Sequence, residues 1–221
     1  IWFSSIKWEF DSPTGYYLLI RIMEEIKLNT EISIFKTTLP SFPQQKLVEE
    51  AYCNSDIRDV PRQPQEQSPG LQSDVHIING KLEECSKIIN NILVTKFYPN
   101  SNFKFGFRNW IYISNRTTIT SFYHSHTKMS QLKCEGNWTW TYYIQMPNQL
   151  KEEEGKLSFL VEKDKTFSIL PKEGDLLIFP ASLQHKPFET PNSTRDRIVL
   201  AGTIGKLDMN HRYTKDRQTL M

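Results

Sequence analysis

WTWTYYIQM, residues 138–146, decides the fold class. Its residues are almost all aromatic or β-branched, the types that favour a strand. Similar short runs stand on both sides of it, separated by Gly, Pro, Asn or charged residues: WIYIS (110–114), KLSFLV (156–161), FSILP (167–171), DLLIFP (175–180) and RIVLAGTI (197–204). Many short strands in succession predict a β-sandwich or barrel.

The first half of the chain has a different pattern. PQQKLVEEAYC (43–53) and NGKLEECSKIINNILVTKFY (79–98) predict two helices, and EISIFKTTLP (31–40) predicts a strand. The second helix carries one apolar face, made by Leu82, Cys85, Ile88, Ile89 and Ile92. The polar, proline-rich residues 59–74 between the helices predict a loop, either a plain connector or a lid over the mouth of a barrel. The protein is therefore expected to be mainly β with supporting helices on one side.

The chain of 221 residues is expected to form a single domain. Met23 opens a segment typical of a translation start, so residues 1–22 are interpreted as an N-terminal extension that the fold does not need. Residues 23–221 then form the domain, with helical support at 30–105, the β core at 106–206 and a tail at 207–221.

The composition limits the function classes. The net charge is only +2, and basic and acidic residues are mixed along the chain, so no dedicated nucleic-acid surface is predicted. Three scattered cysteines without a C-x-x-C pair are typical of reduced thiols, and no apolar run is long enough for a membrane span or signal peptide. We therefore expect a cytoplasmic protein, and the sequence does not specify an oligomeric state.

Two of the five histidines lie in FYHSHTKM (122–129). In a strand, His124 and His126 would point to the same side and could share a metal ion. Alternatively, one is a surface residue and the other satisfies a backbone carbonyl. His185, at the end of a strongly apolar run, strengthens the metal interpretation, whereas His76 and His211 have no such setting and are interpreted as ordinary.

Arg197 opens the apolar run RIVLAGTI. A buried guanidinium is costly without an anion, and its planar fork suits a carboxylate or phosphate. If Arg197 faces inward, small or medium side chains share its face and leave room beside it, namely Val199, Ala201 and Thr203. The other interpretation is a surface residue paired with Asp196 or Asp175. Arg195 is interpreted as a solvated turn residue.

These motifs resemble the Fe(II)- and 2-oxoglutarate-dependent oxygenases with the double-stranded β-helix fold (jelly roll, cupin-like). The similarity covers residues 110–204 and is greatest to the prolyl-hydroxylase-like branch with many uncharacterised bacterial and phage proteins. The resemblance implies that His124 and His185 bind iron and that Arg197 binds the distal carboxylate of 2-oxoglutarate. It also implies that the Tyr143 hydroxyl contacts that carboxylate and that Tyr112 lines the pocket, although core packing explains both tyrosines equally well.

One position departs from the family pattern. The usual motif is His-x-Asp with a distal histidine, and this chain has His126 in place of the acid. No Asp or Glu lies between Trp110 and Cys134 to replace it. Either His126 is a third metal ligand, or two histidines and an additional water complete the site. Three histidines would also bind zinc or copper, so iron is implied by the resemblance alone.

The resemblance implies a hydroxylase that uses Fe(II), O2 and 2-oxoglutarate and releases succinate and CO2. Its substrate would be a protein or peptide side chain or a small metabolite, and no membrane or nucleic-acid partner is expected. Two alternatives remain open. One is a cupin-type three-histidine dioxygenase that does not use 2-oxoglutarate, and the other is a non-catalytic jelly roll that binds a ligand.

Overall fold

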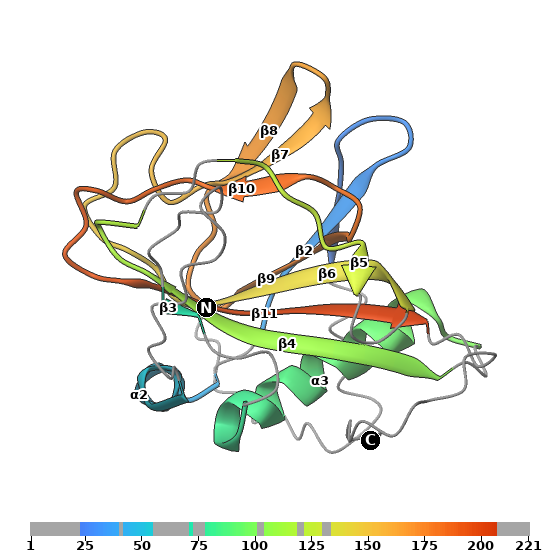
Figure 1. Ribbon diagram of the computed structural model, residues 1–221, viewed down its shortest axis with the longest axis horizontal. Coiled ribbons are helices and arrows are strands. Elements are labelled where there is room, and N and C mark those ends of the chain that lie inside the picture. Colours follow the sequence, from blue (N-terminus) through green and yellow to red (C-terminus); the bar gives the residue numbers. More distant parts are fainter. Residues whose placement is uncertain are drawn as a thin grey trace, which may run out of the picture.

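The computed structural model describes residues 23–39, 42–54, 71–72, 78–100, 104–118, 122–129 and 134–206. These residues form two antiparallel β-sheets and two helices (Figure 1). The fold is mainly β, as the short aromatic and β-branched runs predict.

The larger sheet has eight strands in the order β1-β2-β9-β6-β11-β4-β3, and β5 pairs with β6. Its central strands are long, and β11 pairs with β4 on one side and with β6 on the other, the latter with a register shift near each end. The strand bounds are Glu24–Lys27 (β1), Ser33–Thr38 (β2), Leu71–Gln72 (β3), Phe105–Ser114 (β4), Lys128–Met129 (β5), Cys134–Gln145 (β6), Asp175–Pro180 (β9) and Arg197–Lys206 (β11).

The smaller sheet has three strands in the order β10-β7-β8 and stands over one face of the larger sheet (Figure 1). Its bounds are Leu157–Glu162 (β7), Lys165–Ile169 (β8) and His185–Pro187 (β10). A hydrophobic cluster joins the facing sides of the two sheets, with Phe159 of β7 against Phe179 of β9 at a ring-centroid distance of 5.1 Å. This facing side of the larger sheet is called the inner face below.

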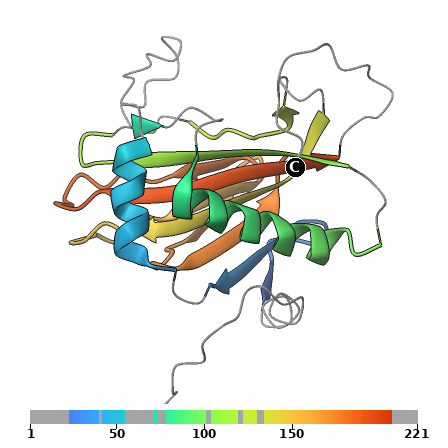
Figure 2. The ribbon, with the colours of Figure 1, turned by 90° about the horizontal axis from the view of Figure 1, so that it is seen from below.

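Helices α2 (Gln44–Asn54) and α3 (Gly80–Phe97) cover the opposite face of the larger sheet (Figure 2). Side chains of β6 point alternately to the two faces of the larger sheet, so this strand contributes to the packing on both. Trp140 and Tyr142 belong to the cluster beneath the helices, whereas Tyr143 belongs to the cluster between the sheets. Side chains alternate with period two along a strand, so each strand fills two cores at once.

A buried polar contact anchors α3 to the sheet. The indole nitrogen of Trp140 donates to Asn90 Oδ1 at 3.2 Å, and Asn90 Nδ2 donates to Asn109 Oδ1 at 3.5 Å. Gly202 leaves room for these groups, because a Cβ there would lie 2.5 Å from Asn109 Oδ1 and 2.6 Å from the Trp140 ring. The helix register on the sheet is therefore fixed by hydrogen bonds as well as by apolar packing.

The element boundaries differ from the sequence predictions at three places. Strands β1 and β2 join the larger sheet, so its strands begin well before residue 106. Leu71 and Gln72, inside the predicted loop 59–74, form the short strand β3 against β4. Residues 122–127 do not form a regular strand, as described below. Residues 1–22, the tail 207–221, and the predicted ordinary histidines His76 and His211 lie outside the described residues.

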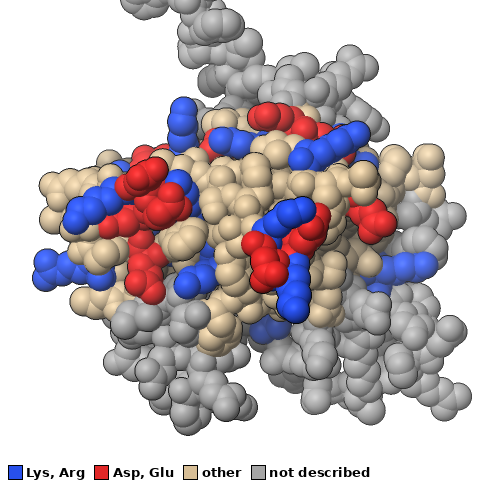
Figure 3. All heavy atoms as spheres, turned by 90° about the horizontal axis from the view of Figure 1, so that it is seen from above, with Lys and Arg blue, Asp and Glu red and all other residues tan. Residues whose placement is uncertain are grey.

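Charges are mixed on the surface. On the face shown in Figure 3, Lys and Arg side chains are interspersed with Asp and Glu side chains. Several charged side chains form ion pairs, such as Lys156 with Glu153 at 2.8 Å. The described residues on this face form no single-sign stripe of the kind that tracks a nucleic-acid backbone. Neither of the two described helices is both long and apolar enough to cross a membrane.

Candidate metal centre

Backbone hydrogen bonds bring the predicted histidines together. His124 N donates to His185 O at 3.1 Å, and His185 N donates to His124 O at 2.9 Å, which makes an isolated antiparallel bridge. His126 N donates to Ala181 O at 2.9 Å, on the turn after β9. The segment 122–127 is therefore held against β10 and the end of β9, at the edge of the inner face.

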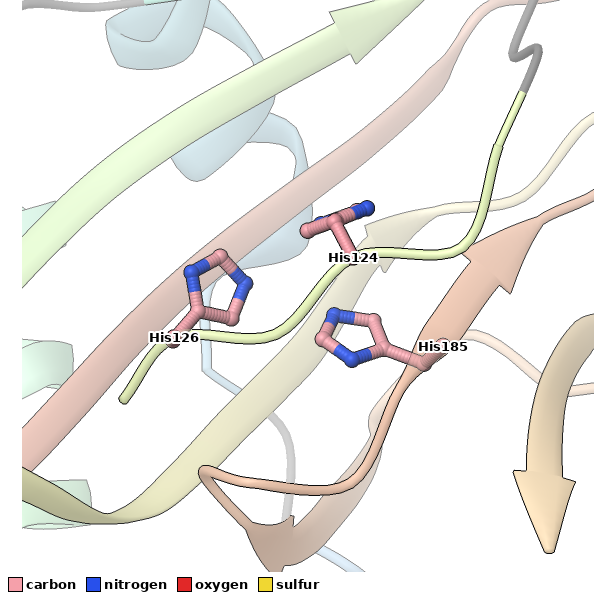
Figure 4. A group of neighbouring side chains, drawn as sticks. All are labelled: His124, His126 and His185. Carbon is pink, nitrogen blue, oxygen red and sulfur yellow. The ribbon is translucent and has the colours of Figure 1, made fainter. Parts of the chain in front are cut away.

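The three imidazoles converge. One ring nitrogen from each of His124, His126 and His185 lies within 4.8 Å of the others, and the rings point toward one another (Figure 4). The ring centroids of His124 and His185 are 4.5 Å apart, and His126 is 5.1 Å from each. His124 and His126 lie together as expected, but they do not lie in a regular strand. They belong to an irregular segment that backbone hydrogen bonds hold against His185 and Ala181.

The tautomer of His185 leaves a nitrogen for a metal. Its Nδ1 lies 3.0 Å from Leu183 O, and a carbonyl oxygen only accepts, so Nδ1 carries the proton. The lone pair then belongs to Nε2. Burial, and secondly the neighbouring His124, lower the pKa of His185 to about 3, so the ring is neutral at physiological pH. A neutral imidazole oriented by a backbone carbonyl is the usual form of a metal-binding histidine.

Aromatic rings flank the histidines. Phe179 of β9 lies 4.7 Å from the His185 ring, and Trp110 of β4 lies 5.1 Å from the His126 ring, between ring centroids.

A hydrogen bond holds the segment before His124 to the smaller sheet. The Tyr123 hydroxyl lies 2.8 Å from Ser158 Oγ of β7. The sequence analysis did not identify Tyr123 or Ser158, because only the folded chain brings them together.

Three imidazoles beside aromatic rings fit a divalent transition metal. Imidazole suits iron, zinc and copper, and three ligands leave further coordination positions open. Among the described residues, these three histidines are the one group of His, Cys, Asp and Glu side chains close enough to hold a metal ion together. The donor set fits iron but does not select it over zinc or copper.

Arg197 faces inward, as the interpretation as a ligand-binding residue requires. The residue is 2% exposed, its Nε donates to Ser114 Oγ at 3.1 Å, and its Nη1 donates to Phe188 O at 3.0 Å. Both acceptors are neutral. Across the described ranges no carboxylate forms an ion pair with Arg197, and burial lowers its pKa from the usual value.

The alternative interpretation of Arg197 as a surface residue paired with Asp175 or Asp196 does not hold. Asp175 forms an ion pair with Lys36 at 2.9 Å, and Asp196 Oδ2 accepts from the Tyr52 hydroxyl at 2.7 Å. Arg195, in contrast, is a half-exposed turn residue paired with Glu173, in agreement with its sequence interpretation.

Both predicted tyrosines lie beside Arg197. Val199 pairs in register with Tyr112 on one side and Tyr143 on the other, so the two tyrosines flank β11 on the inner face. Each interacts electrostatically with Arg197. Burial raises the pKa of Tyr143 to about 12, although Arg197 opposes this shift, so its hydroxyl stays protonated and can donate. A buried guanidinium beside two phenol groups fits a carboxylate.

Comparison with known proteins gives similarity in structure only. No protein-family model matches the sequence, and no curated protein matches it. Among solved structures, a Pseudomonas putida prolyl-4-hydroxylase matches with a TM-score of 0.59 and 12% identity, covering 79% of this chain and 93% of that chain. A second similar structure is a Trichoplax adhaerens prolyl hydroxylase in complex with a peptide fragment of the hypoxia inducible factor oxygen degradation domain. It matches with a TM-score of 0.61 and 13% identity, and the match covers 86% of this chain and 88% of that chain.

A third similar structure is HygX from Streptomyces hygroscopicus with nickel, 2-oxoglutarate and hygromycin B bound. Its TM-score is 0.55 at 9% identity, and the match covers 78% of this chain and 82% of that chain. The chain has the jelly-roll fold of the 2-oxoglutarate-dependent oxygenases. The resemblance inferred from the sequence motifs is confirmed at the level of the fold.

Proposed function

We propose that this protein is an iron- and 2-oxoglutarate-dependent oxygenase. The observation that carries the proposal is Arg197, a buried cation on the same inner face as the three histidines, which donates hydrogen bonds to two neutral oxygens, Ser114 Oγ and Phe188 O. Burial of a guanidinium away from water is unfavourable unless an anion pairs with it. A dianionic co-substrate that reaches from the metal to Arg197 supplies that anion.

His124, His126 and His185 would hold the iron. When bound, iron together with O2 and 2-oxoglutarate supplies the oxidation that places one oxygen atom on the substrate and the other in succinate, with loss of CO2. The part of His185 is to present Nε2, which the hydrogen bond from its Nδ1 to Leu183 O keeps oriented. The backbone bridge between His124 and His185 supports this role, because it would hold two of the proposed ligands close together before any metal binds.

Arg197 and Tyr143 would bind the distal carboxylate of 2-oxoglutarate. The guanidinium contributes charge and two parallel donors, and the protonated Tyr143 hydroxyl contributes a third donor. Ser114 and Phe188 O hold the guanidinium in place from the other side. Tyr112, half-buried and across β11 from Tyr143, would bound the same space. These contacts orient the co-substrate and exclude water from its far end.

The neutral donor set changes the charge at the metal. A carboxylate ligand would remove one unit of positive charge, whereas three imidazoles leave the whole 2+ charge of the ion. The two negative charges of the co-substrate then compensate the ion and Arg197 in part. His126 in place of an acid is thus compatible with an anionic co-substrate.

The substrate of the reaction is proposed as a protein or peptide side chain or a small metabolite. Similar structures include one with a peptide fragment and one with hygromycin B, so the fold accommodates both kinds. A second candidate function rests on the three histidines themselves, which are also compatible with a dioxygenase that consumes O2 without 2-oxoglutarate.

Succinate formation separates these functions. Purified protein loaded with Fe(II) should convert 2-oxoglutarate to succinate slowly without substrate and faster when a cell extract is added. His185→Ala should abolish both rates, whereas Lys165→Ala, at an exposed position on β8, should leave them unchanged. Oxygen uptake without succinate would favour the second function, and the absence of both from iron-loaded protein would favour a non-catalytic jelly roll.

A further inference from the structure

We propose that Arg108, together with Thr139 and Thr203, binds an anionic group of the substrate on the far side of the three histidines from Arg197. The inference rests on the proposed function and adds a substrate class to it, namely molecules or side chains that carry a carboxylate or a phosphate.

The neighbours of Arg108 on β4 place it on the inner face. Phe107 packs with the cluster beneath the helices, and Asn109 accepts a hydrogen bond from Asn90 of α3, so both point to the helical side. Because side chains alternate along a strand, Arg108 points the other way, as Trp110 does. Its Nε is buried and the residue as a whole is half-buried, so part of the side chain lies within the protein.

The order of inner-face residues along β4 places Arg108 relative to the metal centre. Trp110 contacts His126, with ring centroids 5.1 Å apart, and Ser114 accepts a hydrogen bond from Arg197. From Trp110, the strand therefore leads to Arg197 in one direction and to Arg108 in the other. The co-substrate would occupy the first side, so the second side is left for the substrate.

Two hydroxyls share the row of Arg108 in the sheet. Thr203 pairs with Arg108 across β4 and β11, and Thr139 pairs with Thr203 across β11 and β6. Both threonines are buried, and their hydroxyl oxygens lie 3.4 Å apart, so they hydrogen-bond to each other only weakly. A guanidinium with two hydroxyl donors in one row matches the oxygens of a carboxylate or a phosphate.

The charge balance of the inner face points to the same class of substrate. On β4, β9 and β11, the described inner-face side chains near the site include two arginines, Arg108 and Arg197, and the acid Asp175. Lys36 pairs with that acid. With a divalent ion and no carboxylate ligand, the dianionic co-substrate leaves net positive charge, which an anionic substrate would reduce.

The test uses inorganic phosphate and acetate as separate probes. The protein is loaded with less than one equivalent of cobalt(II), saturated with 2-oxoglutarate so that Arg197 is occupied, and titrated with each probe. The 31P line width of phosphate and the methyl proton line width of acetate report how close each anion comes to the paramagnetic ion. The line of a probe that binds at Arg108 should broaden, and the effect should saturate as the probe concentration rises. The probe that binds more tightly identifies the preferred anion.

Arg108→Met should weaken the binding of that probe by about tenfold or more, and Arg108→Lys should weaken it less because it keeps the charge. Thr203→Val leaves the arginine in place and should weaken binding by a smaller factor, which keeps the test valid if Arg108→Met does not fold. Arg116→Met, at an exposed arginine after β4, should titrate like wild type.

The outcomes separate the two proposals. Cobalt content and the binding of 2-oxoglutarate are measured first, and failure of either would overturn the proposed function and this inference together. If both bind, broadening that is absent in wild type, or equal in wild type and in Arg108→Met, would overturn the assignment of Arg108 alone.

Discussion

His124 and His185 bridge two distant parts of the chain through a reciprocal pair of backbone hydrogen bonds, of 3.1 and 2.9 Å, that also sets their side chains 4.5 Å apart between ring centroids. Two metal-binding candidates thus sit on residues whose backbones hold each other. Such a bridge reduces the cost of assembling the site, since the ligands are placed by the fold and not by the metal.

The first prediction concerns His126. If its imidazole is a third ligand, His126→Ala should lower the affinity for Fe(II) by about tenfold or more, or at least about 1.4 kcal/mol. His126→Asp should recover much of this loss because a carboxylate also binds Fe(II). Anaerobic equilibrium dialysis followed by metal analysis measures both.

The same dialysis should find almost no iron in His185→Ala. Iron affinity in His126→Ala equal to that of wild type would show that His126 is not a ligand and that water completes the site.

The second prediction concerns the contact between Tyr123 and Ser158. Tyr123→Phe removes a hydrogen bond of 2.8 Å without touching a ligand, so it should loosen the segment that carries His124. A typical hydrogen bond contributes about 0.5–1.5 kcal/mol, so the Fe(II) affinity should fall by roughly two- to tenfold. Ser158→Ala should give a similar loss, and the double variant should lose little more than either single one. Additive losses would mean that the two side chains act independently.

The third prediction concerns alkaline pH and Tyr143. Below its ordinary pKa of 10.0, Tyr143 is protonated in both the folded and the unfolded chain, and its contribution to stability is complete. Because burial raises its pKa in the folded state to about 12, between these two values only the unfolded chain loses the proton. The free energy of unfolding should therefore fall with rising pH in this window, by about 1.4 kcal/mol per pH unit for one tyrosine.

Tyr143→Phe should remove that part of the slope, as measured by urea unfolding at a series of pH values. Other buried tyrosines contribute to the wild-type slope, so the informative quantity is the difference between the two proteins. Identical slopes would mean that Tyr143 ionises as readily in the folded protein as in the unfolded chain.

The fourth prediction concerns Gly202. A Cβ at this position would lie 2.5 Å from Asn109 Oδ1 and 2.6 Å from the Trp140 ring, so Gly202→Ala should destabilise the protein by about 1–3 kcal/mol. Asn109→Ala removes one of these contacts, and Gly202→Ala should then cost less in that background. Chemical denaturation of the four proteins measures the coupling, and a cost that is the same in both backgrounds would contradict the close packing.

Much of the fold could be predicted from local sequence pattern. The runs DLLIFP and RIVLAGTI correspond to β9 and β11, and the apolar face of residues 79–98 corresponds to α3. Aromatic and β-branched runs, a 3.6-residue period and bounding turn residues are all local signals. The strand β3 was missed because a pair of residues in a proline-rich segment carries no period, and its pairing with β4 is a long-range contact.

The residues of the candidate site could be predicted from the sequence, but the contacts that bring them together could not. The spacing of His124, His126 and His185, and a charge at the head of an apolar run, identified four residues that the fold brings to one side of the sheet. The convergence depends on tertiary hydrogen bonds to Ala181 and between His124 and His185, which no local pattern encodes. Ser114 has no signal of its own, because its role follows from sheet register with Arg197.

The most direct test of the central proposal is an anaerobic titration of the Fe(II) protein with 2-oxoglutarate, followed by the charge-transfer absorbance that chelation produces. Wild type should show a saturable band. Arg197→Met should bind iron as wild type does but bind 2-oxoglutarate about 30-fold or more weakly, equivalent to about 2–5 kcal/mol, and Arg197→Lys should fall between them. A wild-type titration without a saturable change, or an Arg197→Met variant that titrates like wild type, would contradict the account.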